Sequence, residues 1–170
     1  MSQIEFALFL ESAVRLGIPL ALAAMGETIT ERSGVINIGL EGSIIAGALG
    51  GALGAIALEG AGLGLAYGAL AGLLVALVFA VFAISLGADQ IITGTAVTIG
   101  GLGMTGAVYQ VLFGANGMEL SVPTLAPVTI PWLSEIPVVG RALFAQAPTA
   151  YFAYVMAPIS WYVLFKTAWG

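Results

Sequence analysis

The side chains of this protein that could take part in chemistry are concentrated in one stretch between two apolar runs. Residues 25–47 read MGETITERSGVINIGLEGSIIAG, although only 8% of the whole chain is charged. An ionisable group at membrane depth costs about 2.5–3.5 kcal/mol on insertion unless it faces a partner or a water-filled path. Irregular backbone persists at that depth only where protein or a cavity covers it. The polar side chains of this stretch are Glu27, Glu31, Arg32, Asn37 and Glu41, and glycines at positions 34, 39 and 42 interrupt any helix there.

The composition excludes most other kinds of site. The chain contains no His and no Cys, which rules out His-based acid–base catalysis, His or thiolate metal ligation and disulfides. Its few carboxylates show no spacing with a nucleophile or metal ligand, so we expect no enzyme activity, no cofactor and no metal. The net charge is −5 and no basic patch is present, so we expect no nucleic-acid partner.

Lipid is the solvent that the composition requires. Hydrophobic residues make up 60% of the 170 residues, far above the roughly 45–50% of a soluble domain, and the mean hydropathy is +1.09. We predict an all-α, polytopic transmembrane bundle forming one domain over residues 1–170, with a broken, polar helix start near residues 26–42. About five membrane segments have the length that a bilayer requires, at residues 6–24, 35–58, 63–86, 91–113 and 149–165.

The first of these segments has two interpretations. It carries Glu11 and Arg15 on one helical face, where the two side chains can pair. It is therefore either a tilted span with its charged face toward the bundle or an amphipathic segment at the interface.

Glycines at four-residue spacing mark the next two segments. Small residues at this spacing let helix backbones approach closely in lipid. We predict tight helix packing rather than a hinge at Gly47, Gly51, Gly64, Gly68 and Gly72.

The segment at 91–113 is the least apolar and is rich in threonine. Threonine hydroxyls can line a path, but they also bond back to helix carbonyls, so interior packing is the alternative. We take Thr93 and Thr95, with Glu27, Asn37 and Glu41, as candidates for lining a translocation path. For Glu41 the alternative is a structural carboxylate that caps a broken helix or pairs with Arg32.

Residues 114–148 contain most of the prolines, which excludes a continuous membrane helix there. Trp132 and the apolar residues 136–144 indicate that part of this segment lies along the bilayer interface, where Trp is favoured. Positive-inside counting places Arg32 and Lys166 in the cytoplasm and the Pro-rich loop outside. The prolines are Pro123, Pro127, Pro131, Pro137 and Pro148.

Four stretches resemble one family of transport proteins. They read PLALAAMGETITERSGVINIGLEGSIIAGA, ADQIITGTAVTIGGLGMTG, PWLSEIPVVGRALF and WYVLFKTAWG. The chain resembles ABC-transporter permease subunits of the branched-chain amino acid/ribose-type superfamily. It looks closest to the nucleoside and simple-sugar permeases that work with a basic-membrane-protein-type binding lipoprotein. The ERSGVINIGLEG core is the specific part of this resemblance.

The resemblance implies a multi-pass protein of the plasma membrane and a set of partners. These are a second permease subunit, identical or paralogous, a cytoplasmic ABC ATPase and an extracytoplasmic solute-binding lipoprotein. The absence of a G-x-x-x-x-G-K-[ST] pattern agrees with ATP being handled by a separate subunit. Members of the family are longer than this chain, so we expect an amino-terminal half, from a truncation or a split gene, that is inactive by itself.

Two other classes of function remain open from the residues alone. In an ion-coupled secondary transporter, Glu27 and Glu41 near a broken helix would bind the coupling ion. In a channel or structural membrane subunit, the glycines would serve helix packing without any coupling to an energy source.

Overall fold

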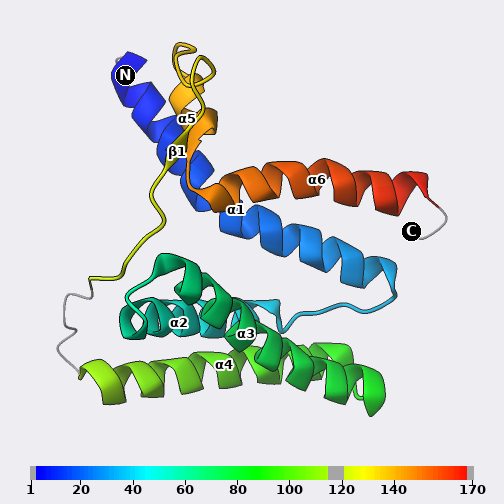
Figure 1. The fold of residues 1–170 in the computed structure, drawn as a ribbon. Coiled ribbons are helices and arrows are strands. Elements are labelled where there is room, and N and C mark those ends of the chain that lie inside the picture. Colours follow the sequence, from blue (N-terminus) through cyan, green and yellow to red (C-terminus); the bar gives the residue numbers. More distant parts are fainter. Residues whose placement is uncertain (1–2, 115–120, 168–170) are drawn as a thin grey trace. The chain divides into compact units, whose positions relative to one another are not determined.

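The protein is helical almost throughout. The computed structural model describes residues 3–114 and 121–167 (Figure 1). A π-helical turn, Val81–Ser85, extends the third helix, and the short strands β1 (Val128–Thr129) and β2 (Ala145–Gln146) form an antiparallel pair. The helices are α1 (Gln3–Arg32), α2 (Leu40–Ala57), α3 (Ala61–Ala80), α4 (Gln90–Phe113), α5 (Gly140–Phe144) and α6 (Pro148–Lys166).

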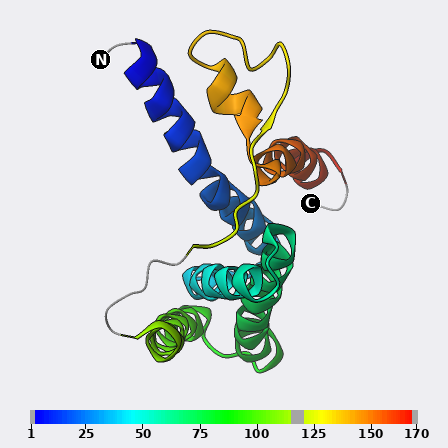
Figure 2. The same cartoon turned by 60° about the vertical axis from the view of Figure 1, so that its left-hand side comes forward.

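The chain divides into two compact units. The first comprises Met1–Arg32 and Leu125–Gly170 and therefore holds α1, α5, α6 and the strand pair. The second is the continuous segment Ser33–Thr124, which holds α2, α3 and α4. Figure 2 shows the helices of each unit from a second direction.

Four helices of the described residues are long and apolar enough to cross a membrane: α1, α2, α3 with its π-helical turn, and α4. This confirms the prediction of a polytopic, all-α membrane protein. The expected fifth segment, at 149–165, forms helix α6 but does not belong to this set. Whether α6 crosses the membrane therefore stays a prediction.

The polar break occupies only part of the range that we predicted. We predicted a broken helix start near residues 26–42, but α1 continues through Gly26 and Glu27 to Arg32. Threonine hydroxyls are accommodated within the helix, because Thr28 donates to the Ala24 carbonyl (2.8 Å) and Thr30 to the Glu27 carbonyl (2.9 Å). The helix ends before Gly34, whose φ of +84° is a conformation that glycine adopts without strain.

We had predicted that the second segment begins at Val35. Helix α2 begins instead at Leu40. The non-helical residues are 33–39. The broken region thus belongs to the start of the second unit.

Helices α2 and α3 pack so closely that their backbones are in contact. A Cβ atom added to Gly68 would lie 2.8 Å from the Gly47 carbonyl oxygen. One added to Gly64 would lie 2.8 Å from the Gly51 carbonyl oxygen, and one at Gly72 would lie 3.2 Å from that of Ser43. The structure therefore brings together all five glycines that we had assigned to helix packing. At 2.8 Å even a methyl group displaces backbone, since real Cβ atoms do not approach that closely.

Helix α4 begins at a side-chain cap. Asp89 Oδ1 accepts hydrogen bonds from the N–H groups of Ile91 and Ile92, each at 2.9 Å. This satisfies two of the donors that a helix start leaves without partners. The cap therefore sets where α4 begins.

In the first unit, α6 runs parallel to the carboxyl-terminal part of α1. Near the start of α6, Ala150 and Ala153 pack against Ile18 in a small buried cluster. At the other end, the Arg32 guanidinium donates to the Leu164 carbonyl and lies 4.7 Å from the centre of the Phe165 ring. Both helices therefore end side by side.

The described part of the Pro-rich segment is folded and contains helix α5. Strand β1 pairs with β2, with Val128 opposite Gln146, and α5 packs on α1. Gln146, only 4% exposed, donates through Nε2 to the carbonyls of Ala142 (2.8 Å) and Glu11 (3.5 Å). The Tyr151 hydroxyl donates to the Val128 carbonyl at 2.6 Å. Part of the predicted loop, residues 115–120, lies outside the described residues.

The close approach of α2 and α3 predicts that Gly68→Leu destabilises the protein. The added side chain has backbone on its path, and overpacking of this kind costs about 1–3 kcal/mol. Unfolding in mixed detergent micelles measures the loss. Gly62→Leu on the same helix is the matched control, because a Cβ there meets nothing within 4 Å. Equal stability of the two variants would contradict the packing role of Gly68.

The buried Gln146 amide predicts that Gln146→Leu loosens the Pro-rich segment from α1. The variant keeps the volume but removes the Gln146 donor from the buried Ala142 carbonyl, at a cost of about 1–3 kcal/mol. We expect hydrogen exchange at the α5 amides to accelerate about tenfold, which corresponds to about 1.4 kcal/mol. The exposed Gln110→Leu on α4 should leave these rates unchanged. Unaltered exchange in Gln146→Leu would show that the amide does not hold the segment.

Candidate functional site

The non-helical residues 33–39 are held by side chains of α4. The Ile36 N–H donates to the Gln90 Oε1 atom at 2.8 Å, and the Thr98 hydroxyl donates to the Ile38 carbonyl at 3.2 Å. Within the segment, the Leu40 N–H donates to the Asn37 carbonyl at 3.2 Å. Backbone groups that a helix would have satisfied internally thus find partners on a neighbouring helix.

Glycines let the broken segment and the start of α2 lie directly on α4. A Cβ added to Gly94 would lie 2.8 Å from the Gly39 nitrogen, and one at Gly42 would lie 2.8 Å from the Val97 carbonyl oxygen. Gly101 completes the seam, because its Cβ would lie 3.0 Å from the Gly42 Cα atom. Any side chain at these positions would push α2 away from α4.

This α2–α4 seam was missing from our sequence-based packing residues. The available signal was spacing, since residues three or seven apart share one face of a helix. Gly39 and Gly42 are three apart, and Gly94 and Gly101 are seven apart. The spacing could identify these faces, but it could not identify their partner.

Beside the seam lies a groove of about 420 Å³ with both polar and apolar walls. Its polar groups are the Asn37 amide, the Glu41 carboxylate and the hydroxyls of Thr95 and Thr98. Ile38, Leu40 and Ile99 supply the apolar surface. A concave site with a few convergent polar groups among apolar side chains is typical of small-molecule binding.

The Glu41 carboxylate is the charged group of the groove. It is exposed in the first turn of α2, where the helix dipole favours a negative charge. Gly39, at the start of α2, provides no side-chain cap. Arg32, the partner we had considered for Glu41, belongs to the other unit, so that pairing stays a prediction. A hydrogen bond from a solute to the Glu41 carboxylate also stays a prediction.

The hydroxyl groups of the two groove threonines on α4 already donate hydrogen bonds within the protein. Thr95 donates to the Ile91 carbonyl at 2.8 Å in its own helix, and Thr98 donates to the Ile38 carbonyl. Each hydroxyl keeps lone pairs that can accept a hydrogen bond. The groove therefore offers mainly acceptors, together with the Asn37 amide, whose Oδ1 atom is buried. This pattern suits a neutral solute with several hydroxyl groups.

Of the five residues that we predicted for a path, three line this groove: Asn37, Glu41 and Thr95. Thr93 does not line it and lies half-buried in the first turn of α4. Glu27 belongs to the other unit, where its carboxylate accepts a hydrogen bond from Thr30 at 3.1 Å. Whether Glu27 and Thr93 border a path stays a prediction.

Comparisons with known proteins place the chain in a family. The family described as branched-chain amino acid transport system / permease component matches residues 9–170. The guanosine ABC transporter permease protein NupQ of Bacillus subtilis is 38% identical over 89% of this chain and 50% of its own length. The nucleoside ABC transporter permease protein NupC of Lactococcus lactis is 31% identical over 89% of this chain and 50% of its own length.

A third relative, TsgC13 of Haloferax volcanii, is an ABC transporter permease protein provisionally named for glucose. It is 34% identical over 95% of this chain and 49% of its own length. This chain thus spans about half the length of the curated relatives it matches. No solved structure matches it. The chain belongs to the permease-component family of the branched-chain amino acid transport systems.

Proposed function

We propose that this chain forms part of a permease subunit in an ATP-driven ABC importer for nucleosides or simple sugars. The observation that carries the proposal is the groove in which a carboxylate, an amide and two hydroxyls converge on a broken helix held by α4. Nucleosides and sugars are neutral molecules that present several hydroxyl groups to such acceptors. The printed names of the relatives, guanosine, nucleoside and glucose permeases, support the same class of solute.

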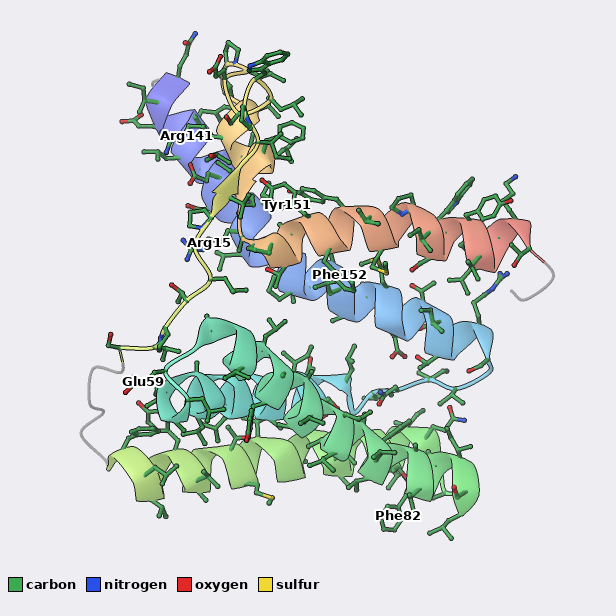
Figure 3. The ribbon with its side chains drawn as sticks, in the orientation of Figure 1. Arg15, Glu59, Phe82, Arg141, Tyr151 and Phe152 are labelled. Atoms are coloured by element: carbon green, nitrogen blue, oxygen red, sulfur yellow. The ribbon has the colours of Figure 1, made fainter. Side chains whose placement is uncertain are left out.

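The first unit supports one orientation in the membrane. Arg32 and Lys166 lie where α1 and α6 end side by side. Arg141 lies beside the amino-terminal part of α1, as Figure 3 shows. Positive residues concentrate on the cytoplasmic side. We therefore assign the ends of α1 and α6 to the cytoplasm and the Pro-rich segment 114–148 to the extracytoplasmic side.

The partners follow from this arrangement as part of the proposal. A second permease subunit, identical or paralogous, completes the path, and an extracytoplasmic lipoprotein delivers the solute. A cytoplasmic ABC ATPase supplies the energy and binds near the end of α6. The groove borders the path, and alternating access comes from one helix group moving against another.

The groove chemistry predicts that Glu41→Gln impairs uptake by the complete permease with its ATPase. The substitution keeps the shape but replaces the charged acceptor, and hydrogen bonds to charged groups contribute about 1.5–3 kcal/mol. We expect uptake of the solute at low concentration to fall about tenfold or more. Glu59→Gln, at the exposed turn between α2 and α3, is the matched control. Normal uptake by Glu41→Gln at a normal membrane level would remove Glu41 from the path.

The proposal also predicts the source of energy. Uptake should stop when the ATPase subunit carries a substitution that blocks ATP hydrolysis. It should continue when an uncoupler collapses the ion gradients while ATP is held constant. The reverse result would favour an ion-coupled secondary transporter, in which Glu41 beside the broken helix binds the coupling ion.

A further inference from the structure

The Pro-rich segment ends in a compact tip, residues 130–139, built on two tight turns. In each turn the N–H of one residue donates to the carbonyl of a proline two positions earlier. Leu133 donates to Pro131 at 2.9 Å, and Val139 donates to Pro137 at 2.8 Å. The central residues, Trp132 and Val138, have φ angles of +70° and +69°. This form of γ-turn is rare and strained, and a bulky or β-branched residue is an outlier in it.

The strained turns hold apolar side chains out of the protein. Trp132 is 85% exposed. Such strain costs about 1–3 kcal/mol for each residue, and fully burying a large apolar side chain would have gained about 1.5–3 kcal/mol. Neither the strained turns nor the exposed Trp132 side chain stabilises the fold of the described residues. The other large exposed apolar residues of the tip are Leu133, Ile136 and Val139.

The tip lies against the amino-terminal part of α1. Pro137 and Val138 line a groove of about 280 Å³ together with Ile4 and Leu8 of that helix. The Gln146 amide, which donates to the Glu11 carbonyl, holds the base of the tip to the same part of α1. The tip is therefore fixed in position relative to a helix that is long and apolar enough to span the membrane.

The apolar surface of the tip continues onto this helix. Ile4, Phe6, Leu8 and Phe9 of α1 are all exposed, with Phe9 at 62%. One exposed apolar surface thus extends from a candidate membrane span to Trp132. Within residues 130–139 the only charged side chain is that of Glu135. Where the tip meets α1, the groove is also lined by the charged side chains of Glu11 and Arg141.

We propose that the tip inserts into the headgroup layer of the extracytoplasmic leaflet, with Trp132 as its anchor and phospholipid as its partner. The indole ring combines an apolar body with one N–H donor, which is the reason Trp concentrates at membrane interfaces. Glu135 remains among the headgroups. The tip thereby fixes the depth of α1, and Gln146 and the β1–β2 pair transmit that position to the start of α6.

Spin labels on the tip test this proposal. The chain has no Cys, so Leu133→Cys or Ile136→Cys introduces its only thiol, and thiols elsewhere in the complete permease are changed to Ser. The labelled permease is reconstituted in vesicles of phosphatidylethanolamine and phosphatidylglycerol. Collisions of each nitroxide with oxygen, which enriches in lipid, are compared with collisions with a water-soluble nickel chelate. Both positions should collide often with oxygen and rarely with nickel.

A pair of substitutions at the anchor provides the matched control. Trp132→Phe keeps an apolar ring and should leave both collision rates unchanged. Trp132→Glu should raise the nickel collisions at positions 133 and 136 several-fold, because it replaces the apolar anchor with a charge that is disfavoured in the membrane.

Two results would overturn the proposal. Frequent nickel collisions with Trp132 in place would show that the tip stands in water. Rare collisions with both probes would show that protein covers it, either the remainder of the permease or a partner. Neither result bears on the proposed transport function, which uptake measures separately.

Discussion

A backbone that leaves the helical conformation must find other hydrogen-bond partners, and this constraint explains the contacts that residues 33–39 make. A membrane protein can leave the helical conformation only where its own groups replace the lost bonds. Here the replacement comes from α4, through the Gln90 side chain at Ile36 and the Thr98 hydroxyl at Ile38. These bonds require the two segments to be in contact. The close packing of α2 on α4 therefore follows from the need to satisfy an irregular segment.

Glycine is what makes that contact possible. Packing rather than water exclusion drives helix association in lipid, and it strengthens as the backbones approach. Gly42 and Gly101 meet at the α2–α4 seam, and Gly47 and Gly68 meet at the α2–α3 contact. Helix α2 thus uses one glycine face for each neighbour. Its remaining face carries Glu41, which lines the groove.

In the first unit, side-chain hydrogen bonds connect both end regions of α1 to other elements. The Arg32 guanidinium joins the end of α1 to the end of α6, and the Gln146 amide joins the amino-terminal part of α1 to the Pro-rich segment. Between these two bonds the contact is small and apolar, centred on Ile18 and Ala153. The polar bonds therefore set the register of α6 along α1, because a short apolar contact permits sliding.

The sequence by itself determined the solvent and the uniform helices. Sixty per cent hydrophobic residues require lipid. The spans predicted at 63–86 and 91–113 agree closely with Ala61–Ser85 and Gln90–Phe113, because apolarity is continuous there and Asp89 gives a local start signal. These properties depend on residues close together in the chain.

Only the tertiary structure decided which polar residues meet. From the sequence, Gly26 and Glu27 suggested a break, yet α1 continues through them. A single glycine costs a helix only about 1 kcal/mol, and the nearby threonine hydroxyls donate hydrogen bonds within the helix. Thr95 faces the groove and Thr93 does not, because two residues along a helix amount to about 200° of rotation. That rotation is set by Gly94 and Gly101 lying on Gly39 and Gly42, a contact between segments more than fifty residues apart. No local pattern in the chain contains that information.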